Sequence, residues 1–248
     1  MSVPSEIYQR FHQELAERFQ PLGWRYVKSG PCLKKKVKDI EFSISMGASW
    51  HNSQFSSRVR VAVWGYCKSI SKKDCPASSM LWFRLAPSDG QDSEWWELIT
   101  PEGYQYALED VTSLLEKTIL PVVKSFEEDY EKAARELALK GYSSPLMVCR
   151  PVSHICFANV RFTSYLFGDA LGQQSARNQY ALMSELTKKW VKNQMQTYLS
   201  QMEKAKWYLS VNGGYLVNAD IMYMVDHGMI ALSPDGEVIF PPLEPSEK

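Results

Sequence analysis

The chain has 248 residues, of which 45% are hydrophobic and 23% are charged, a composition that indicates a globular protein and excludes a disordered or fibrous one. Its 28 basic residues equal its 28 acidic residues in number, so the net charge favours no class of partner. At this length the chain can form one large core or two modest domains.

The sequence predicts a cytoplasmic protein that does not contact a membrane. No apolar run approaches the roughly 20 residues needed to span a bilayer. The N-terminal stretch turns polar at once and lacks the apolar core of a signal peptide. The cysteines are odd in number and form no C-x-x-C pair, which favours reduced thiols over a disulfide framework.

In chain order, the first predicted element is a helix that Ser5 caps and that runs to about Phe19. Short strands with short connections follow, at residues 24–28, 32–37, 40–46, 58–68 and 80–85. The polar stretch at residues 47–57 is expected to be a long hairpin loop. This succession predicts an antiparallel β-meander.

A second helical stripe covers residues 101–139, with Thr100 as its N-cap, a dividing proline at Pro121 and a C-cap at Gly141. Helix, meander and long kinked helix together predict an α+β domain at residues 1–140.

The remainder, residues 141–248, is predicted to be a mainly α-helical region that packs on this domain. Its elements are a helix from Ser153 to Leu166, a long helix at 176–207, a short helix at 218–227 and a hairpin at 230–240.

Two of the predicted strands have two distinct faces. Aliphatic residues alternate with other residues at 40–46 and 59–63, and this alternation places the aliphatic set on a buried face. The opposite face of the strand at 58–66 carries Arg58, Arg60, Trp64 and Tyr66, and Lys34 and Lys36 extend the positive charge on a neighbouring strand. Arginines bind phosphates or carboxylates, and aromatic rings stack on bases or fill interface pockets.

The charge distribution supplies an alternative role for this face. Residues 24–84 contain twelve basic and three acidic residues, whereas residues 101–150 contain six basic and nine acidic ones. The basic strands could therefore be solvated, or be covered and neutralised by later helices, without binding any other molecule.

The loop from Ser49 to Ser57 is a second candidate surface, because it holds Trp50, His51 and Phe55 among small polar residues. Loops on a rigid scaffold often carry function. The alternative is a hairpin tip that folds back onto its own sheet. Of the adjacent Trp95 and Trp96, one is expected to seal the core, since neighbours cannot both point inward.

The sequence contains no local signature of catalysis. G-x-S-x-G and a glycine-rich phosphate loop are both missing, and the four histidines are isolated from other metal ligands. We therefore predict no catalytic residue, no metal and no cofactor. A site assembled from distant residues remains an open alternative.

The N-terminal half resembles a bacterial domain family of unknown function, number 4304. The likeness covers residues 5–139 and lies in an opening helix followed by the segments PLGWRYVKSGPCLKKKVKDIEFSIS, RVRVAVWGYC and WWELITPEGYQYALEDV. The resemblance implies a helix–sheet–helix fold without an assigned activity. Because some such families supply immunity proteins that neutralise a toxin by binding it, it implies a binding protein and transfers no functional residue.

These observations lead to three hypotheses. The first is a non-catalytic protein-binding module, plausibly a bacterial immunity or inhibitor-like protein, since aromatic residues are 12% of the chain and are enriched at interfaces. The second is a nucleic-acid-binding module that uses the basic-aromatic strand face, and the third is an enzyme with a dispersed site. The candidate binding residues are Arg58, Arg60, Trp64, Tyr66, Lys34, Lys36 and Trp50.

Overall fold

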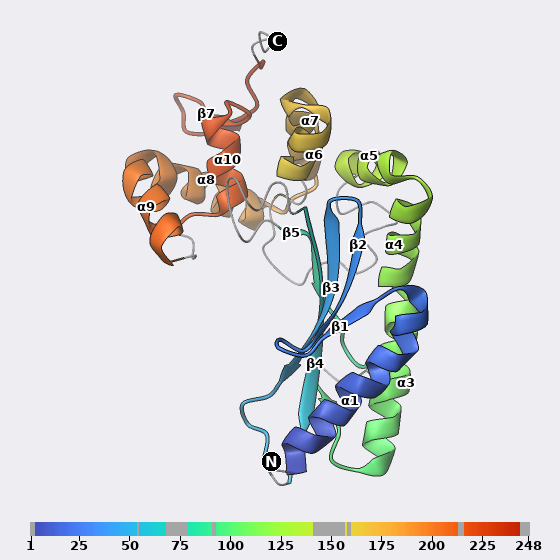
Figure 1. The fold of residues 1–248 in the computed structure, drawn as a ribbon. Coiled ribbons are helices and arrows are strands. Elements are labelled where there is room, and N and C mark those ends of the chain that lie inside the picture. Colours follow the sequence, from blue (N-terminus) through green and yellow to red (C-terminus); the bar gives the residue numbers. More distant parts are fainter. Residues whose placement is uncertain are drawn as a thin grey trace. The chain divides into compact units, whose positions relative to one another are not determined.

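The computed structural model describes residues 3–53, 55–67, 79–90, 93–140, 157, 160–212 and 216–243. It confirms the predicted α+β class, with an antiparallel sheet in the N-terminal half and helices in the C-terminal region (Figure 1). The chain divides into two compact units. Unit 1 contains the described residues of 3–66 and 81–129, and unit 2 contains the described residues of 67–80, 130–140 and 157–243.

Helix α1 (Val3–Phe19) opens unit 1. The helix begins at Val3, so Ser5 lies inside its first turn and not at the predicted N-cap. Pro4 does not prevent this earlier start, because the N–H groups of the first turn have no partner within the helix and a missing one breaks no hydrogen bond. A 3-10 turn, η1 (Gln20–Leu22), ends at Gly23, whose φ of 83° lies in the left-handed region that favours glycine. The apolar stripe of α1 is buried and consists of Phe11, Leu15 and Phe19.

The sheet of unit 1 is the predicted meander. Its first five strands are adjacent in chain order: β1 (Arg25–Val27), β2 (Cys32–Val37), β3 (Ile40–Ala48), β4 (Arg58–Cys67) and β5 (Ser79–Arg84). A further strand, β6 (Trp96–Glu97), pairs with the start of β4 and places Glu97 opposite Arg58. The sequence does not predict β6, because two residues are too few to show a period of two.

The predicted helix at residues 101–139 is divided into α3 (Pro101–Lys117), α4 (Ile119–Glu128) and α5 (Tyr130–Lys140). Thr100 caps α3 as predicted, since its Oγ1 accepts a hydrogen bond of 3.0 Å from Gly103 N. Pro121 divides the helix as predicted: it lacks an N–H for the preceding turn and is accommodated in the first turn of α4. The predicted cap at Gly141 lies outside the described residues.

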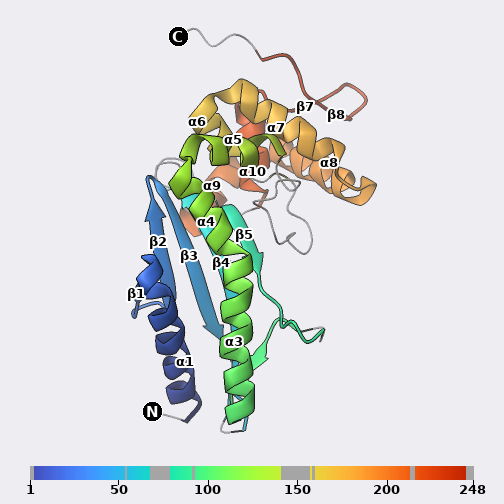
Figure 2. The ribbon, with the colours of Figure 1, turned by 90° about the vertical axis from the view of Figure 1, so that its right-hand side faces the viewer.

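The core of unit 1 lies between the aliphatic face of the sheet and helices α1, α3 and α4, which cover that face (Figure 2). The ring of Phe42 packs 5.7 Å from that of Phe126 in α4. This arrangement confirms the predicted alternation. At most 4% of the surface is exposed for each of Ile40, Phe42, Ile44, Met46, Val59, Val61 and Val63.

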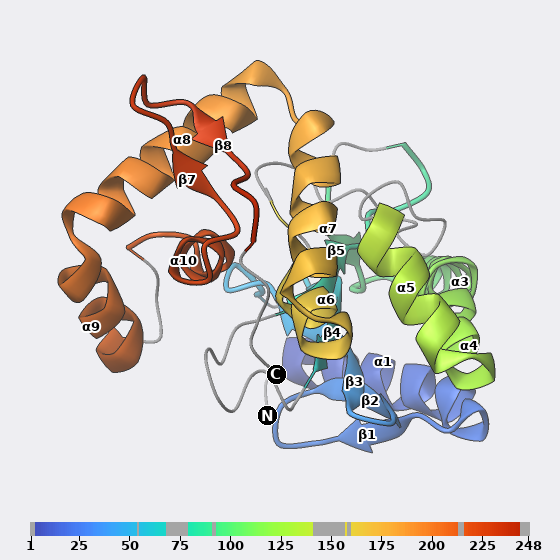
Figure 3. The ribbon, with the colours of Figure 1, turned by 90° about the horizontal axis from the view of Figure 1, so that it is seen from above.

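Unit 2 consists of α5, α6 (Val160–Phe167), α7 (Asp169–Ala181), α8 (Glu185–Ser200), α9 (Met202–Asn212), α10 (Ala219–Asp226) and the hairpin β7–β8 (Ala231–Leu232 and Val238–Ile239). The hairpin lies beside α8 (Figure 3). The short helix and the hairpin were predicted, whereas the cap at Ser153 lies outside the described residues.

The single long helix predicted at residues 176–207 is wrong. The chain breaks after Ala181, and Ser184 begins α8 as an N-cap whose Oγ accepts a hydrogen bond of 3.2 Å from Thr187 N. The apolar spacing conceals this turn, because Met183 and Leu186 continue the helical period on either side of the cap. A second break at Gln201 separates α8 from α9.

Helices α6 and α7 approach closely at Gly172. A Cβ atom at this position would lie 1.9 Å from Ser164 Oγ and 3.2 Å from Ser164 Cβ. We expect Gly172→Ala to lower the free energy of unfolding by about 1–3 kcal/mol, because it overpacks this contact. Urea unfolding measures the loss. Adding Ser164→Ala, which removes the hydroxyl, should recover part of the stability; no recovery would contradict this explanation.

Candidate functional site

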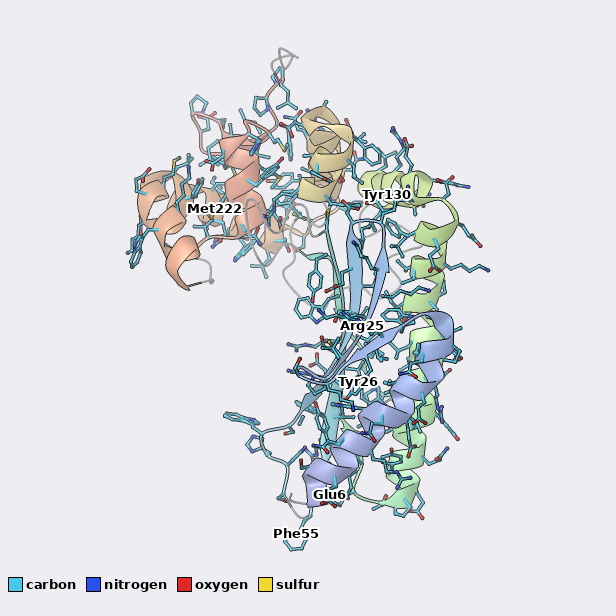
Figure 4. The ribbon with its side chains drawn as sticks, in the orientation of Figure 1. Glu6, Arg25, Tyr26, Phe55, Tyr130 and Met222 are labelled. Atoms are coloured by element: carbon cyan, nitrogen blue, oxygen red, sulfur yellow. The ribbon has the colours of Figure 1, made fainter. Side chains whose placement is uncertain are left out.

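The loop between β3 and β4, of which residues 49–53 and 55–57 are described, presents two aromatic side chains to solvent, and we call these residues the hairpin tip. Trp50 is 91% exposed and Phe55 is 79% exposed, the highest exposures among the large hydrophobic side chains that the structure describes. Phe55 projects from the far end of the loop (Figure 4). The tip therefore does not fold back onto the sheet with these side chains.

Backbone hydrogen bonds fix the shape of the hairpin tip. Ser49 N donates to Arg58 O at 3.1 Å, and Ser53 and Ser56 exchange hydrogen bonds of 2.8 and 3.2 Å. The side chain of Asn52 closes the loop, because its amide donates to Arg58 O at 3.2 Å and its Oδ1 accepts from Arg58 N at 2.9 Å. The exposed aromatic rings thus stand on an ordered backbone.

Glu97 of β6 anchors the tip at its C-terminal end. Its carboxylate accepts hydrogen bonds from Ser57 N at 2.7 Å, from Ser56 Oγ at 3.1 Å and from Arg58 Nε at 3.1 Å. Burial opposes ionisation of this group, but these hydrogen bonds prevail and lower the pKa of Glu97 below its ordinary value. The carboxylate is therefore charged at neutral pH.

Helix α1 anchors the other end of the tip. Tyr8 Oη donates a 2.6 Å hydrogen bond to the carbonyl oxygen of Met46, three residues before Ser49. Desolvation raises the pKa of Tyr8 to about 12, against the opposing effect of a backbone hydrogen bond at Ala48. The phenol stays protonated and keeps its donor at any physiological pH.

The basic-aromatic face, defined as Lys34, Lys36, Arg58, Arg60, Trp64 and Tyr66, lies on the side of the sheet opposite α1, α3 and α4. The register places Lys34 opposite Ser43, and Tyr66 forms a hydrogen bond with the same Ser43, so β2 and β4 share this side. Lys35 points to the helical side, where its Nζ lies 2.7 Å from the Glu127 carboxylate of α4. A carboxylate of helix α4 thus neutralises Lys35.

Carboxylates of the sheet and of the loop before β6 lie near other cations of the face. Lys34 Nζ lies 2.8 Å from Glu41 Oε1, within the adjoining strands. Arg58 pairs with Glu97, as described, and Arg60 Nη1 lies 3.9 Å from Glu94 Oε2. The sequence did not reveal these partners, because Glu94 and Glu97 are distant in sequence, and the pairing of the unpredicted strand β6 with β4 places Glu97 opposite Arg58.

Aromatic side chains complete the face. The Arg60 guanidinium lies 5.0 Å from the centroid of the Trp95 ring, while the neighbouring Trp96 is 1% exposed and seals the core as one of the pair was expected to do. Trp64 and Tyr66 stack with 6.4 Å between ring centroids, and both are partly buried. Six of the predicted site residues lie along β2 and β4 on this side of the sheet, and Trp50 lies on the tip.

Among the described residues, no group of three or more histidine, cysteine, aspartate or glutamate side chains is placed to hold a metal ion. Within the same residues, each helix is too short or too polar to cross a bilayer. Comparison of the chain with known protein families, with curated proteins and with solved structures finds no match.

Proposed function

We propose that the chain is a non-catalytic protein-binding module whose hairpin tip inserts Trp50 and Phe55 into a partner protein. The observation that carries this proposal is the exposure of both rings, 91% and 79%, on a loop held by backbone and side-chain hydrogen bonds. An ordered loop loses little conformational entropy on binding. Tryptophan is among the residues that contribute most to the affinity of protein interfaces.

The ion pairs of the basic-aromatic face favour a protein partner over a nucleic acid. A phosphate backbone would have to displace Glu97 from Arg58, and the three carboxylates Glu41, Glu94 and Glu97 would repel it. A protein surface of mixed charge can complement such pairs without breaking them. The face is therefore a flank of the proposed interface and not a phosphate-binding groove.

The test is affinity capture with the full chain as bait in the cells that naturally produce it, compared between wild type and the double variant Trp50→Ala/Phe55→Ala. We expect the amount of bound partner to fall at least about tenfold, since each aromatic anchor contributes on the order of 2 kcal/mol. Quantitative mass spectrometry of the captured proteins measures the change. Both side chains are exposed, so the fold should be unaffected.

Trp207→Ala is the matched control, because it also removes a tryptophan, one that is 58% exposed in unit 2. Capture should be unchanged in this variant. Equal recovery by wild type and the tip variant would show that binding does not use the tip and would refute the proposal. Recovery of a nucleic acid that depends on the tip, with no protein, would also refute it.

The resemblance to a bacterial domain family supports a narrower form of the proposal, in which the partner is a toxin that the chain neutralises as an immunity protein. In that case the captured protein should be toxic when produced alone, and harmless when it is produced with the wild-type chain but not with the tip variant.

A further inference from the structure

His12 of α1 is buried without a hydrogen bond. The residue is 1% exposed, and neither Nδ1 nor Nε2 has a hydrogen-bond partner in the described part of the chain. A charged imidazolium at this position would lose its hydration and gain no acceptor. The folded unit therefore requires the neutral ring.

The groups around His12 offer no compensating charge. Its ring centroid lies 3.9 Å from that of Tyr8 in α1, and 6.5 Å from that of Tyr26 in β1. Burial raises the pKa of both phenols, so both are neutral in acid. Phe11 is the third ring in contact, and the charged neighbours Arg10 and Glu14 pair with each other at 2.6 Å.

A short chain of contacts leads from His12 to the hairpin tip. The ring of Tyr8 packs edge-on against His12, and the hydroxyl of the same Tyr8 holds the Met46 carbonyl oxygen at 2.6 Å. Met46 lies near the end of β3, and Ser49 directly follows that strand. Displacement of Tyr8 would thus release the N-terminal anchor of the tip, while Glu97 would still hold the C-terminal one.

We propose that protonation of His12 displaces Tyr8 and loosens the hairpin tip, so that acid weakens binding at this surface. The regulatory part of this inference rests on the proposed function, since it needs the tip to be the binding surface. The structural part, a tip that loosens in acid, stands on the contacts of His12 and Tyr8 alone.

The expected size follows from linkage. Burial lowers the pKa of His12 from 6.5 to about 4. Any opening that exposes the ring restores its ordinary titration, and such an opening becomes about 30-fold more favourable at about pH 5 than at about pH 7.5. Glu97 is still ionised at that pH, because its pKa lies below the ordinary value, so the C-terminal anchor is unchanged.

Native-state hydrogen exchange of the full chain tests the proposal. The readouts are the amides of Ser49, Asn52 and Ser53, which donate hydrogen bonds inside the tip, with rates corrected for the intrinsic effect of pH. All variants carry His51→Gln, since His51 belongs to the tip and would titrate there itself. Protection of the three amides should fall about 30-fold between about pH 7.5 and pH 5, while amides of α8 stay constant.

Two variants decide the outcome. In His12→Leu, protection of the tip should be nearly independent of pH. In Tyr8→Phe, the amides of α1 should still respond to acid, but the tip should no longer follow them, because the hydrogen bond to Met46 is gone. An equal acid response of the tip in His12→Leu and in the reference would overturn the proposal, as would a tip that does not respond at all.

The outcome of the hydrogen-exchange experiment does not depend on the outcome of the affinity capture. A tip that fails to loosen in acid would leave the proposed function standing if the Trp50→Ala/Phe55→Ala variant loses its partner. Conversely, unchanged capture by that variant would remove the proposed function and the regulatory part, while loosening in acid could still be observed.

Discussion

Replacing Asp220 by alanine is expected to lower the free energy of unfolding of unit 2 by about 1.5–3 kcal/mol, the cost of removing a hydrogen-bond partner of a charged group. Arg161 of α6 is 5% exposed, and its Nε lies 2.7 Å from Asp220 Oδ1 in α10. Removal of the carboxylate takes a charged hydrogen-bond partner from a buried guanidinium, while the Asp220 side chain itself is 27% exposed. Denaturant unfolding, together with hydrogen exchange of α6 and α10, measures the loss.

Two comparisons separate this mechanism from general damage. The pair of Lys192 and Glu237 is as short, at 2.6 Å, but 68% of the Glu237 side chain is exposed, so Glu237→Ala should cost less than about 1 kcal/mol. The double variant Arg161→Met/Asp220→Leu should recover most of the loss, because apolar side chains of similar size can replace a buried pair. Equal costs for Asp220→Ala and Glu237→Ala would contradict the argument.

Acid is expected to destabilise unit 1 through His12 by about 3 kcal/mol between about pH 7.5 and pH 4. Burial lowers the pKa of His12 from 6.5 to about 4, so the neutral ring favours the folded state. The contribution is complete above the pKa of the unfolded chain and is lost as the pH falls from about 6.5 to about 4. Denaturant unfolding at a series of pH values measures it.

His12→Leu provides the comparison for this pH dependence. Carboxylates such as Glu97 also lose charge in acid, but they do so equally in wild type and variant, and their effect cancels in the difference. The variant should be as stable as wild type or more stable at neutral pH, because leucine has no buried nitrogen without a partner. Parallel curves of stability against pH for the two proteins would rule out His12 as the cause.

The sheet of unit 1 could be predicted because its information is local. The alternation runs through nine residues of β3 and ten of β4, which is long enough to separate two faces, and the turns from β1 to β2 and from β2 to β3 are short. The breaks in the helices were predicted only where the residue itself forbids continuation, as Pro121 does. Ser184 begins α8 as its N-cap, but a serine is also compatible with a helix interior. The apolar spacing on either side of it therefore led to the prediction of one continuous helix.

The candidate site could be predicted only in part. Trp50 and Phe55 could be named because a polar loop with aromatic residues is visible in one stretch of sequence. The carboxylates that pair with Arg58 and Arg60 were hidden, since Glu94 and Glu97 are more than thirty positions away and arrive through a strand of two residues. The burial of His12 was hidden for the same reason: a polar residue beside an apolar stripe does not show which other elements cover it.

The shortness of β1 affects whether a strand of another molecule can pair with this edge of the sheet. An edge strand with a free row of N–H and C=O groups can recruit another strand and begin aggregation. Strand β1 has three residues, part of whose N–H and C=O groups are used in pairing with β2, and Arg25, the first of them, is exposed and charged. Strand addition along this edge is therefore disfavoured, and a partner that approaches this side of unit 1 meets side chains and not an open backbone template.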